Sequence, residues 1–253
     1  MDDFEKDREE DQFEEPPLED FLPTEEEERI KEKQRKRRSV ITKVVAIILA
    51  FALVVSALQI WPQIFNLSSI PFLQKSAELS QKEDIRQYKE AVVTIQDQNS
   101  KGTGFNISNK GLIITNHHVI EGMNPITVTF PSGDLFEASL LVTNPDLDLA
   151  ILEIKGENLP YITLSKPDKW RTEDHVYVIG NPLFHNQIVN EGQILKGSHQ
   201  NEVLMLSAPI YKGNSGSPVI STSGDVIGVV FAKSLEEPIG YAIPIEKVLE
   251  KLP

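Results

Sequence analysis

The sequence contains no cysteine among its 253 residues. This absence excludes disulfide bonds, a cysteine nucleophile and cysteine-ligated metal sites. No repeat with a period of 20–50 residues is visible, which excludes solenoids and propellers. The histidine pair His117–His118 lacks the helical spacing of zinc proteases, and the motif Gly102-x-Gly104 is not followed by a helical pattern that could form a dinucleotide loop. We therefore expect neither a metal nor a cofactor.

The globular part of the chain lacks net charge. Residues 1–28 hold fifteen Asp and Glu against Lys6 and Arg8, so this segment alone carries the net charge of −13, and residues 29–253 are neutral. A segment with so many like charges and so few apolar side chains cannot bury enough surface to offset its ordering entropy. Residues 1–28 are therefore predicted to be a disordered acidic tail, which either aids solubility or docks a partner.

A basic segment and an apolar run follow the tail. Residues 29–39 carry seven Lys and Arg and a single acid, Glu32, and residues 40–61 are almost entirely apolar. As a helix, some 21 residues span about 31 Å, which matches a hydrocarbon core of about 30 Å. Positive charge on the N-terminal side favours a cytoplasmic N-terminus. The pattern predicts a single transmembrane helix at 40–61, a linker at 62–78 and an extracytoplasmic remainder; topology accounts for the basic segment, so nucleic-acid binding is not expected.

Two other interpretations of the apolar run are weaker. A cleaved signal peptide would have a much shorter leader and an Ala-x-Ala pattern after the apolar core, and neither is present. A helix buried in a soluble domain is the third interpretation, but most helices of soluble domains are apolar on one face, whereas here apolar residues cover all faces.

The remainder, residues 79–253, shows the pattern of an all-β domain. Residues 79–90 and 245–252 have the periodicity of short helices. Between them lie twelve short runs rich in β-branched residues, separated by Gly, Pro, Asn and Asp: 91–96, 104–107, 112–115, 126–130, 138–143, 150–154, 176–179, 193–195, 203–207, 218–221, 226–231 and 240–243. Strands at this spacing favour barrels or a sandwich over βαβ units.

Three sites on this background carry residues that can activate a hydroxyl. His118 follows an apolar strand, Asp148 precedes another, and Ser215 lies in the run Gly213-Asn214-Ser215-Gly216. Imidazole can take the proton of a serine hydroxyl and return it to a leaving amine. A carboxylate can hold the imidazole tautomer, and backbone N–H groups of a sharp glycine turn can bind an oxyanion. Each residue alone would be structural; the set in this order predicts nucleophilic catalysis.

Residues 90–250 resemble the trypsin-like serine proteases, and most of all the HtrA/Deg group. The matching segments, in family order, are 102–105, 115–119, 148–150, 178–182, 213–216 and 240–244. The resemblance implies two six-stranded β-barrels with the site in the cleft between them. It also implies His118 as base, Asp148 as orienting acid, Ser215 as nucleophile and the N–H groups of Gly213 and Ser215 as oxyanion hole. His117 and His118 would face opposite sides of an extended strand, so only one can face the cleft.

Departures from the family pattern bear on specificity and activation. Ser217 replaces a glycine common in the HtrA group and resembles the glutamyl endopeptidases, yet the strand 228–233 lacks the histidine of their substrate pocket. Phe231, Ala232 and Lys233 are predicted to line the substrate pocket and to favour a small or medium apolar residue before the cleaved bond. Asn214 stands where digestive zymogens have Asp, so we expect no activation by N-terminal processing.

The sequence thus predicts a membrane-anchored serine endopeptidase that cuts extracytoplasmic proteins or peptides through an acyl-enzyme, in quality control or a stress response. HtrA proteases usually carry a peptide-binding PDZ domain after the protease domain, and we expect none here, because the sequence ends at Pro253. A homotrimer is compatible with the sequence. The alternative is a catalytically silent trypsin-like fold that acts as a binding or sensor module.

Overall fold

The computed structural model describes residues 25–64, 69–98, 100–166, 170–182, 185–198 and 202–253, and side chains within 55–71 lie outside this description. The chain divides into two compact units, Met1–Leu67 and Ser68–Pro253, which we describe separately.

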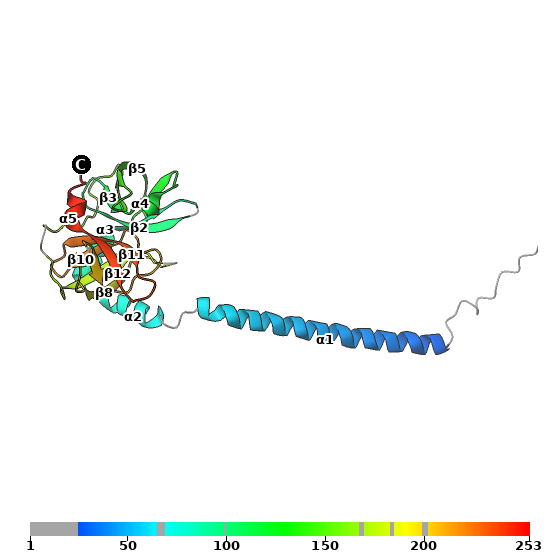
Figure 1. The fold of residues 1–253 in the computed structure, drawn as a ribbon. Coiled ribbons are helices and arrows are strands. Elements are labelled where there is room, and N and C mark those ends of the chain that lie inside the picture. Colours follow the sequence, from blue (N-terminus) through cyan, green and yellow to red (C-terminus); the bar gives the residue numbers. More distant parts are fainter. Residues whose placement is uncertain (1–24, 65–68, 99, 167–169, 183–184, 199–201) are drawn as a thin grey trace, which may run out of the picture. The chain divides into compact units, whose positions relative to one another are not determined.

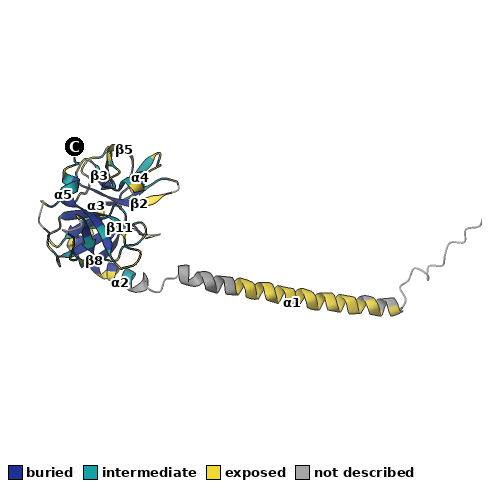
Figure 2. Cartoon of the chain, viewed as in Figure 1, coloured by how far each residue is buried: buried dark blue, intermediate teal, exposed yellow. Residues whose placement is uncertain are grey.

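The first unit contains one long helix, α1 (Glu25–Ile64), which includes both the basic segment and the apolar run. Its described apolar side chains, such as Ile47, Phe51 and Leu53, are exposed (Figure 2). Among the helices of the described residues, none is long and apolar enough to cross a membrane. The side chains of 55–61, the end of the predicted span, and the acidic residues 1–24 lie outside the described part.

The first half of the second unit is a closed antiparallel barrel with the strand order β1-β2-β3-β6-β5-β4. Figure 1 labels β2, β3 and β5 of this barrel. Its strands are β1 (Val92–Gln96), β2 (Lys101–Asn106), β3 (Leu112–Thr115), β4 (Ile126–Thr129), β5 (Leu135–Asn144) and β6 (Leu149–Glu153). β3 and β6 consist almost wholly of buried residues and pair with each other in the barrel wall. The barrel explains why these segments are nearly continuous apolar runs rather than alternating ones.

The second half is a six-stranded antiparallel sheet with the order β8-β7-β10-β11-β12-β9. Its strands are β7 (His175–Gly180), β8 (Ile188–Gln193), β9 (Leu204–Leu206), β10 (Pro218–Ser221), β11 (Val226–Lys233) and β12 (Gly240–Pro244). We expected a second six-stranded barrel, and this expectation is corrected: the sheet is not a closed ladder. β9 has only three residues, so its approach to the end of β8 amounts to one isolated bridge, Ile194–Leu206.

One apolar core joins the barrel to the sheet. Phe105 and Ile114 of the barrel belong to the same buried cluster as Ile179 and Ile220 of the sheet. All four side chains are fully buried, and most strands of both halves are dark blue in Figure 2. Contact between the two halves therefore holds the loops at their facing ends in fixed positions.

Four helices lie outside the strands: α2 (Ser69–Leu79), α3 (Glu83–Ala91), α4 (His117–Ile120) and α5 (Ile245–Leu249). α2 differs from the sequence-based expectation, which placed a linker at 62–78. Pro71 suggested a break, but it lies in the first turn of α2, where the missing N–H has no intrahelical acceptor. Ser76 and Leu79 are buried where this helix meets the domain.

Candidate active site

His118 and Asp148 come together at the ends of two paired strands. β3 and β6 are antiparallel neighbours, with Thr115 opposite Ala150, so the residues after β3 lie beside those before β6. Asp148 Oδ2 lies 2.6 Å from His118 Nδ1, and the backbone N–H of His118 donates to Oδ1 of the same carboxylate at 2.9 Å. The carboxylate thus holds the ring and the backbone of His118 together.

This contact alters the acid–base behaviour of His118. The hydrogen bond from the ring to Asp148 raises the pKa of His118 above its usual value, although partial burial opposes the shift. Because Nδ1 faces the carboxylate, Nδ1 carries the proton and Nε2 is left as the basic nitrogen of the neutral ring.

The turn before β6 gives Asp148 its position. The side chain of Asn144 accepts a hydrogen bond from the N–H of Leu147, and the N–H of Asp148 donates to the carbonyl of Pro145. This tight turn leaves Asp148 with a φ of 52°, in the left-handed region that aspartate tolerates better than most residues. The side chain of Asn116 donates to the carbonyl of Asp148 at 2.8 Å and ties the turn to the end of β3.

His117 has a separate partner. Its Nδ1 lies 2.8 Å from Thr143 Oγ1 on β5, away from Asp148. Both histidines belong to the short helix α4, which follows the end of β3 at Thr115, so they do not lie on an extended strand. Consecutive residues of a helix point about 100° apart around its axis, so the two rings still face different surroundings.

Ser215 lies in a loop whose glycines have left-handed backbone conformations. Gly213 has a φ of 99° and Gly216 a φ of 83°. A side chain at Gly216 would begin 1.9 Å from the carbonyl oxygen of Thr103, so only glycine fits there. The loop can pass so close to β2 because this position has no side chain.

Thr103 on β2 holds the Ser215 loop from one side. Its N–H donates to the carbonyl of Ser215 at 3.1 Å, and its hydroxyl donates to the carbonyl of Gly213 at 2.7 Å. The carbonyl of Thr103 in turn accepts from Thr115 Oγ1, three residues before His118. One buried residue therefore connects the Ser215 loop to the strand that leads to the histidine.

The polar groups of the Ser215 loop that would perform chemistry have no partner among the described residues. Among the described residues, neither the N–H groups of Gly213 and Ser215 nor the hydroxyl of Ser215 makes a hydrogen bond. Donors and a hydroxyl left free in this way are available to a bound carbonyl group.

Comparison with known proteins places the chain in a family. A family model described as a trypsin-like peptidase domain matches residues 102–229, about half of the chain. The chain belongs to the trypsin-like peptidase family. The match includes His118, Asp148 and Ser215.

Several curated relatives share this trypsin-like peptidase domain. The chain is 34% identical over 191 residues to a probable periplasmic serine endoprotease DegP-like of Chlamydia pneumoniae, covering 71% of this chain and 38% of that protein. It is 37% identical over 165 residues to the serine protease Do-like HtrB of Bacillus subtilis (57% and 36%) and 32% identical over 179 residues to the serine endoprotease DegS of Haemophilus influenzae (64% and 52%). The chain thus spans between a third and about half of these relatives.

A solved structure supports the fold. The crystal structure of the serine endoprotease from Yersinia pestis matches with a TM-score of 0.62 and 33% identity, over 66% of this chain and 63% of that one. Fold and relatives agree that the second unit is a trypsin-like peptidase domain.

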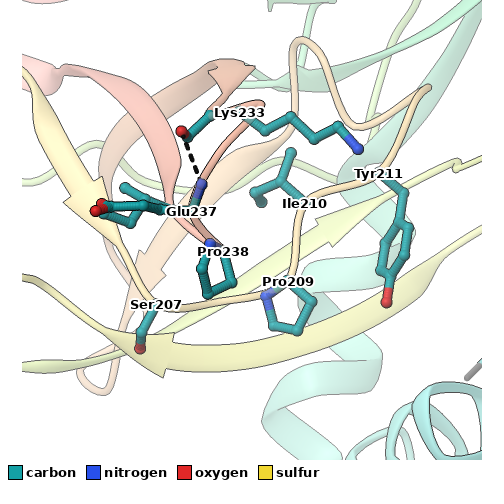
Figure 3. A pocket seen from close by; sticks show the side chains of 9 residues that line it. Ser207, Pro209, Ile210, Tyr211, Lys233, Glu237 and Pro238 are labelled. Atoms are coloured by element: carbon teal, nitrogen blue, oxygen red, sulfur yellow. Dashed lines mark hydrogen bonds between the residues drawn. The ribbon is translucent and has the colours of Figure 1, made fainter.

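A cavity of about 240 Å³ lies against the segment that leads into the Ser215 loop of this trypsin-like peptidase domain. Its walls come from the segment before the loop and from the β11–β12 connection: Ser207, Pro209, Ile210, Tyr211, Lys233, Ser234, Glu237, Pro238 and Ile239. In the view of Figure 3 the Lys233 side chain extends in the direction of Tyr211. Of the three residues expected in a substrate pocket, Lys233 lines this cavity, Phe231 lies against Tyr241, and Ala232 pairs with Tyr241 in the sheet.

Several residues that shape the site were not predicted to do so from the sequence. Thr103, Asn116 and Asn181 are fully buried polar residues, and the N–H of Asn181 donates to Thr103 Oγ1 at 2.9 Å. The sequence could have pointed to them, because all three lie inside segments that carry the family resemblance. Without the fold, however, nothing indicated that they contact the loop or the turn.

Proposed function

We propose that this chain is a serine endopeptidase that uses His118, Asp148 and Ser215. The observation that carries the proposal is the paired contact of the Asp148 carboxylate with the ring and the backbone N–H of His118. A structural histidine needs no such arrangement, whereas a general base requires a fixed tautomer with Nε2 free.

The proposed chemistry gives each of the three residues one role. Ser215 Oγ attacks the carbonyl carbon of a peptide, and its proton passes to Nε2 of His118. The negative charge that develops on the carbonyl oxygen is stabilised by the N–H groups of Gly213 and Ser215, each worth about 10²–10³ in turnover in comparable sites. The C–N bond then breaks, and the amine leaves with the proton from His118. In the second half, His118 takes a proton from water, which attacks the acyl carbon. The bond to Ser215 Oγ then breaks, and Ser215 regains its proton from His118.

The substrate pocket is proposed to be the cavity beside the Ser215 loop. Its apolar lining includes Pro209, Ile210 and Ile239, which would favour a small or medium apolar side chain before the cleaved bond. Lys233 adds a cation at the same cavity. Phe231 and Ala232 lie on β11 directly before Lys233 and do not line the cavity.

The proposal includes an anchored, extracytoplasmic location. Residues 40–61 form an almost uncharged apolar run after a basic segment, within the single helix α1. Relatives described as periplasmic endoproteases favour a domain outside the cytoplasm, acting on exported proteins in quality control or a stress response. We expect the full chain to resist alkaline extraction from membranes, and a chain without residues 1–64 to be released.

The activity is tested with a fluorophosphonate probe and a peptide library. We expect the full chain to be labelled and to cleave peptides, and Ser215→Ala and His118→Ala to do neither. His117→Ala is the matched control, because that ring contacts Thr143 instead of Asp148, and it should keep its activity. An unlabelled and inactive wild-type chain would exclude the proposal and leave the silent binding module as the better function.

A further inference from the structure

The helix α2 packs against the segment that leads into the Ser215 loop. The ring of Phe72 lies 4.6 Å from the ring of Tyr211, centroid to centroid, at an interplanar angle of 58°. Tyr211 is two residues before Gly213, and its carbonyl accepts a hydrogen bond from the N–H of Asn214. Phe72 therefore touches the start of the turn that presents the two free N–H groups.

α2 is held firmly enough to serve as a support. The N–H of Val189 on β8 donates to Ser76 Oγ at 2.9 Å, and Lys75 forms an ion pair with Glu191 at 2.9 Å. Leu79, at the end of the helix, is fully buried. These contacts attach α2 to β8, so the position of Phe72 is set by the sheet.

β8 supports the same segment directly. The side chain of Asn190 donates to the carbonyl of Pro209 at 2.8 Å. A side chain at Gly192 would begin 2.3 Å from the backbone nitrogen of Ala208, so strand and segment are in close contact. Residues 208–211 are thus held by β8 along the backbone and by α2 at the ring of Tyr211.

The other polar groups of the loop do not supply this support. Both side-chain polar atoms of Asn214 and the hydroxyl of Ser217 are buried without a hydrogen-bond partner in the described part of the chain. Thr103 holds the loop from the barrel side at Gly213 and Ser215. Before Gly213, the packing of Phe72 on Tyr211 adds a restraint on the backbone.

We propose that Phe72 is a positioning residue: by packing on Tyr211, α2 holds the Tyr211–Gly213 backbone in the orientation that presents the Gly213 N–H to an oxyanion. Tyr211 also lines the cavity beside the loop, so the same contact sets one wall of the substrate pocket. This inference rests on the proposed peptidase function.

The test compares Phe72→Ala with two other variants in the full, detergent-solubilised chain. We expect Phe72→Ala to lower kcat roughly tenfold or more with a smaller change in KM, because displacement of an oxyanion donor acts on the transition state. Phe72→Tyr, which keeps the ring, should restore kcat. Ile85→Ala truncates a fully buried side chain of α3 in a core cluster that contains none of residues 207–216; it should lower the thermal midpoint at least as much and leave kcat within twofold.

A double substitution locates the effect. If Phe72 acts through Tyr211, Phe72→Ala combined with Tyr211→Ala should lower kcat no further than Tyr211→Ala alone. Unchanged kcat in Phe72→Ala, equal losses in Phe72→Ala and Ile85→Ala, or additive losses in the double variant would each overturn the inference while the wild-type activity stands. A wild-type chain without Ser215-dependent cleavage would overturn the proposed function and this inference together.

Discussion

Single residues in this site have sharply different tolerances for change. His118 depends on one carboxylate for its tautomer, its position and its raised pKa. Gly216 depends on having no side chain, because the carbonyl oxygen of Thr103 occupies the space where Cβ would lie. The first requirement is electrostatic and the second is steric, so different measurements reveal them.

The pH profile should report the His118–Asp148 contact. The neutral ring is the base, so activity should rise with pH through the raised pKa of His118, above 6.5. Asp148→Asn removes the main cause of the shift, so the acid limb should move to lower pH while kcat falls by about 10⁴, as when the orienting carboxylate is lost from such sites. Asp146→Asn, at an exposed residue of the same turn, is the control. An acid limb that stays in place would argue against the contact as its cause.

Stability should change with pH in the opposite sense. A raised pKa in the folded protein means that protonation of His118 favours folding. This contribution is fully present below pH 6.5 and is lost as the pH rises through the folded pKa. The pH range of highest activity is therefore the range in which the His118–Asp148 pair contributes least to stability.

Gly216→Ala should abolish activity and lower the thermal midpoint. Two effects add: the φ of 83°, which costs about 1–2 kcal/mol for a residue with a Cβ, and the collision with Thr103. Gly133→Ala is a matched control, because Gly133 has a φ of 95° and open space around the Cβ position. Equal thermal shifts in the two variants would show that backbone strain, and not the collision, dominates.

At the scale of elements, β2 and the Ser215 loop form one connected structure through Thr103. Thr103 is fully buried, and its backbone and hydroxyl together bond with the loop, with Thr115 and with Asn181. A strand of the barrel thereby sets the geometry of a loop that belongs to the sheet.

Thr103→Val should lower kcat and destabilise the domain by about 1–3 kcal/mol, since the carbonyl of Gly213 and the N–H of Asn181 lose a buried partner. Thr103→Ser keeps the hydroxyl and should retain most of the activity. Thr129→Val is the matched control, because the Thr129 hydroxyl is buried without a hydrogen-bond partner in the described residues. Chemical denaturation and peptide turnover measure both effects; a loss in Thr129→Val as large as in Thr103→Val would contradict the argument.

The sequence predicted well those strands that form an apolar run between turn residues. β3 and β10 have the predicted bounds, because their apolar runs end at clear turn residues. β8 was misplaced at 193–195, since Asn190, Glu191 and Gly192 give it the look of a loop. α2 was missed because proline and polar residues resemble a spacer, and only contact with β8 reveals its buried side. The order of His118, Asp148 and Ser215 predicted a site, but the turn and the contacts that hold it depend on the fold.

At the scale of the whole domain, barrel and sheet share one core and should unfold together. Phe105 is fully buried in the cluster common to both halves. Phe105→Ala should cost about 3–5 kcal/mol and lower the amide-exchange protection of β2 and β10 by the same free energy. Leu135→Ala, at a largely exposed leucine of β5, should leave both unchanged. Protection lost only in the barrel strands would show that the halves open independently.

The short strand β9 is joined to the end of β8 weakly enough to separate from it without unfolding of the domain. One bridge and the flanking bonds from Leu195 to Met205 and from Ser207 to Gln193 join it to the end of β8. A sheet edge that is held by only a few hydrogen bonds opens often. Amide hydrogens there should therefore exchange with solvent before those of β10 or β11. Ser207 lies at this edge and also lines the cavity beside the Ser215 loop. Transient opening at β9 would therefore widen the cavity from its outer side and let bulkier side chains enter, while Thr103 keeps the nucleophile in place.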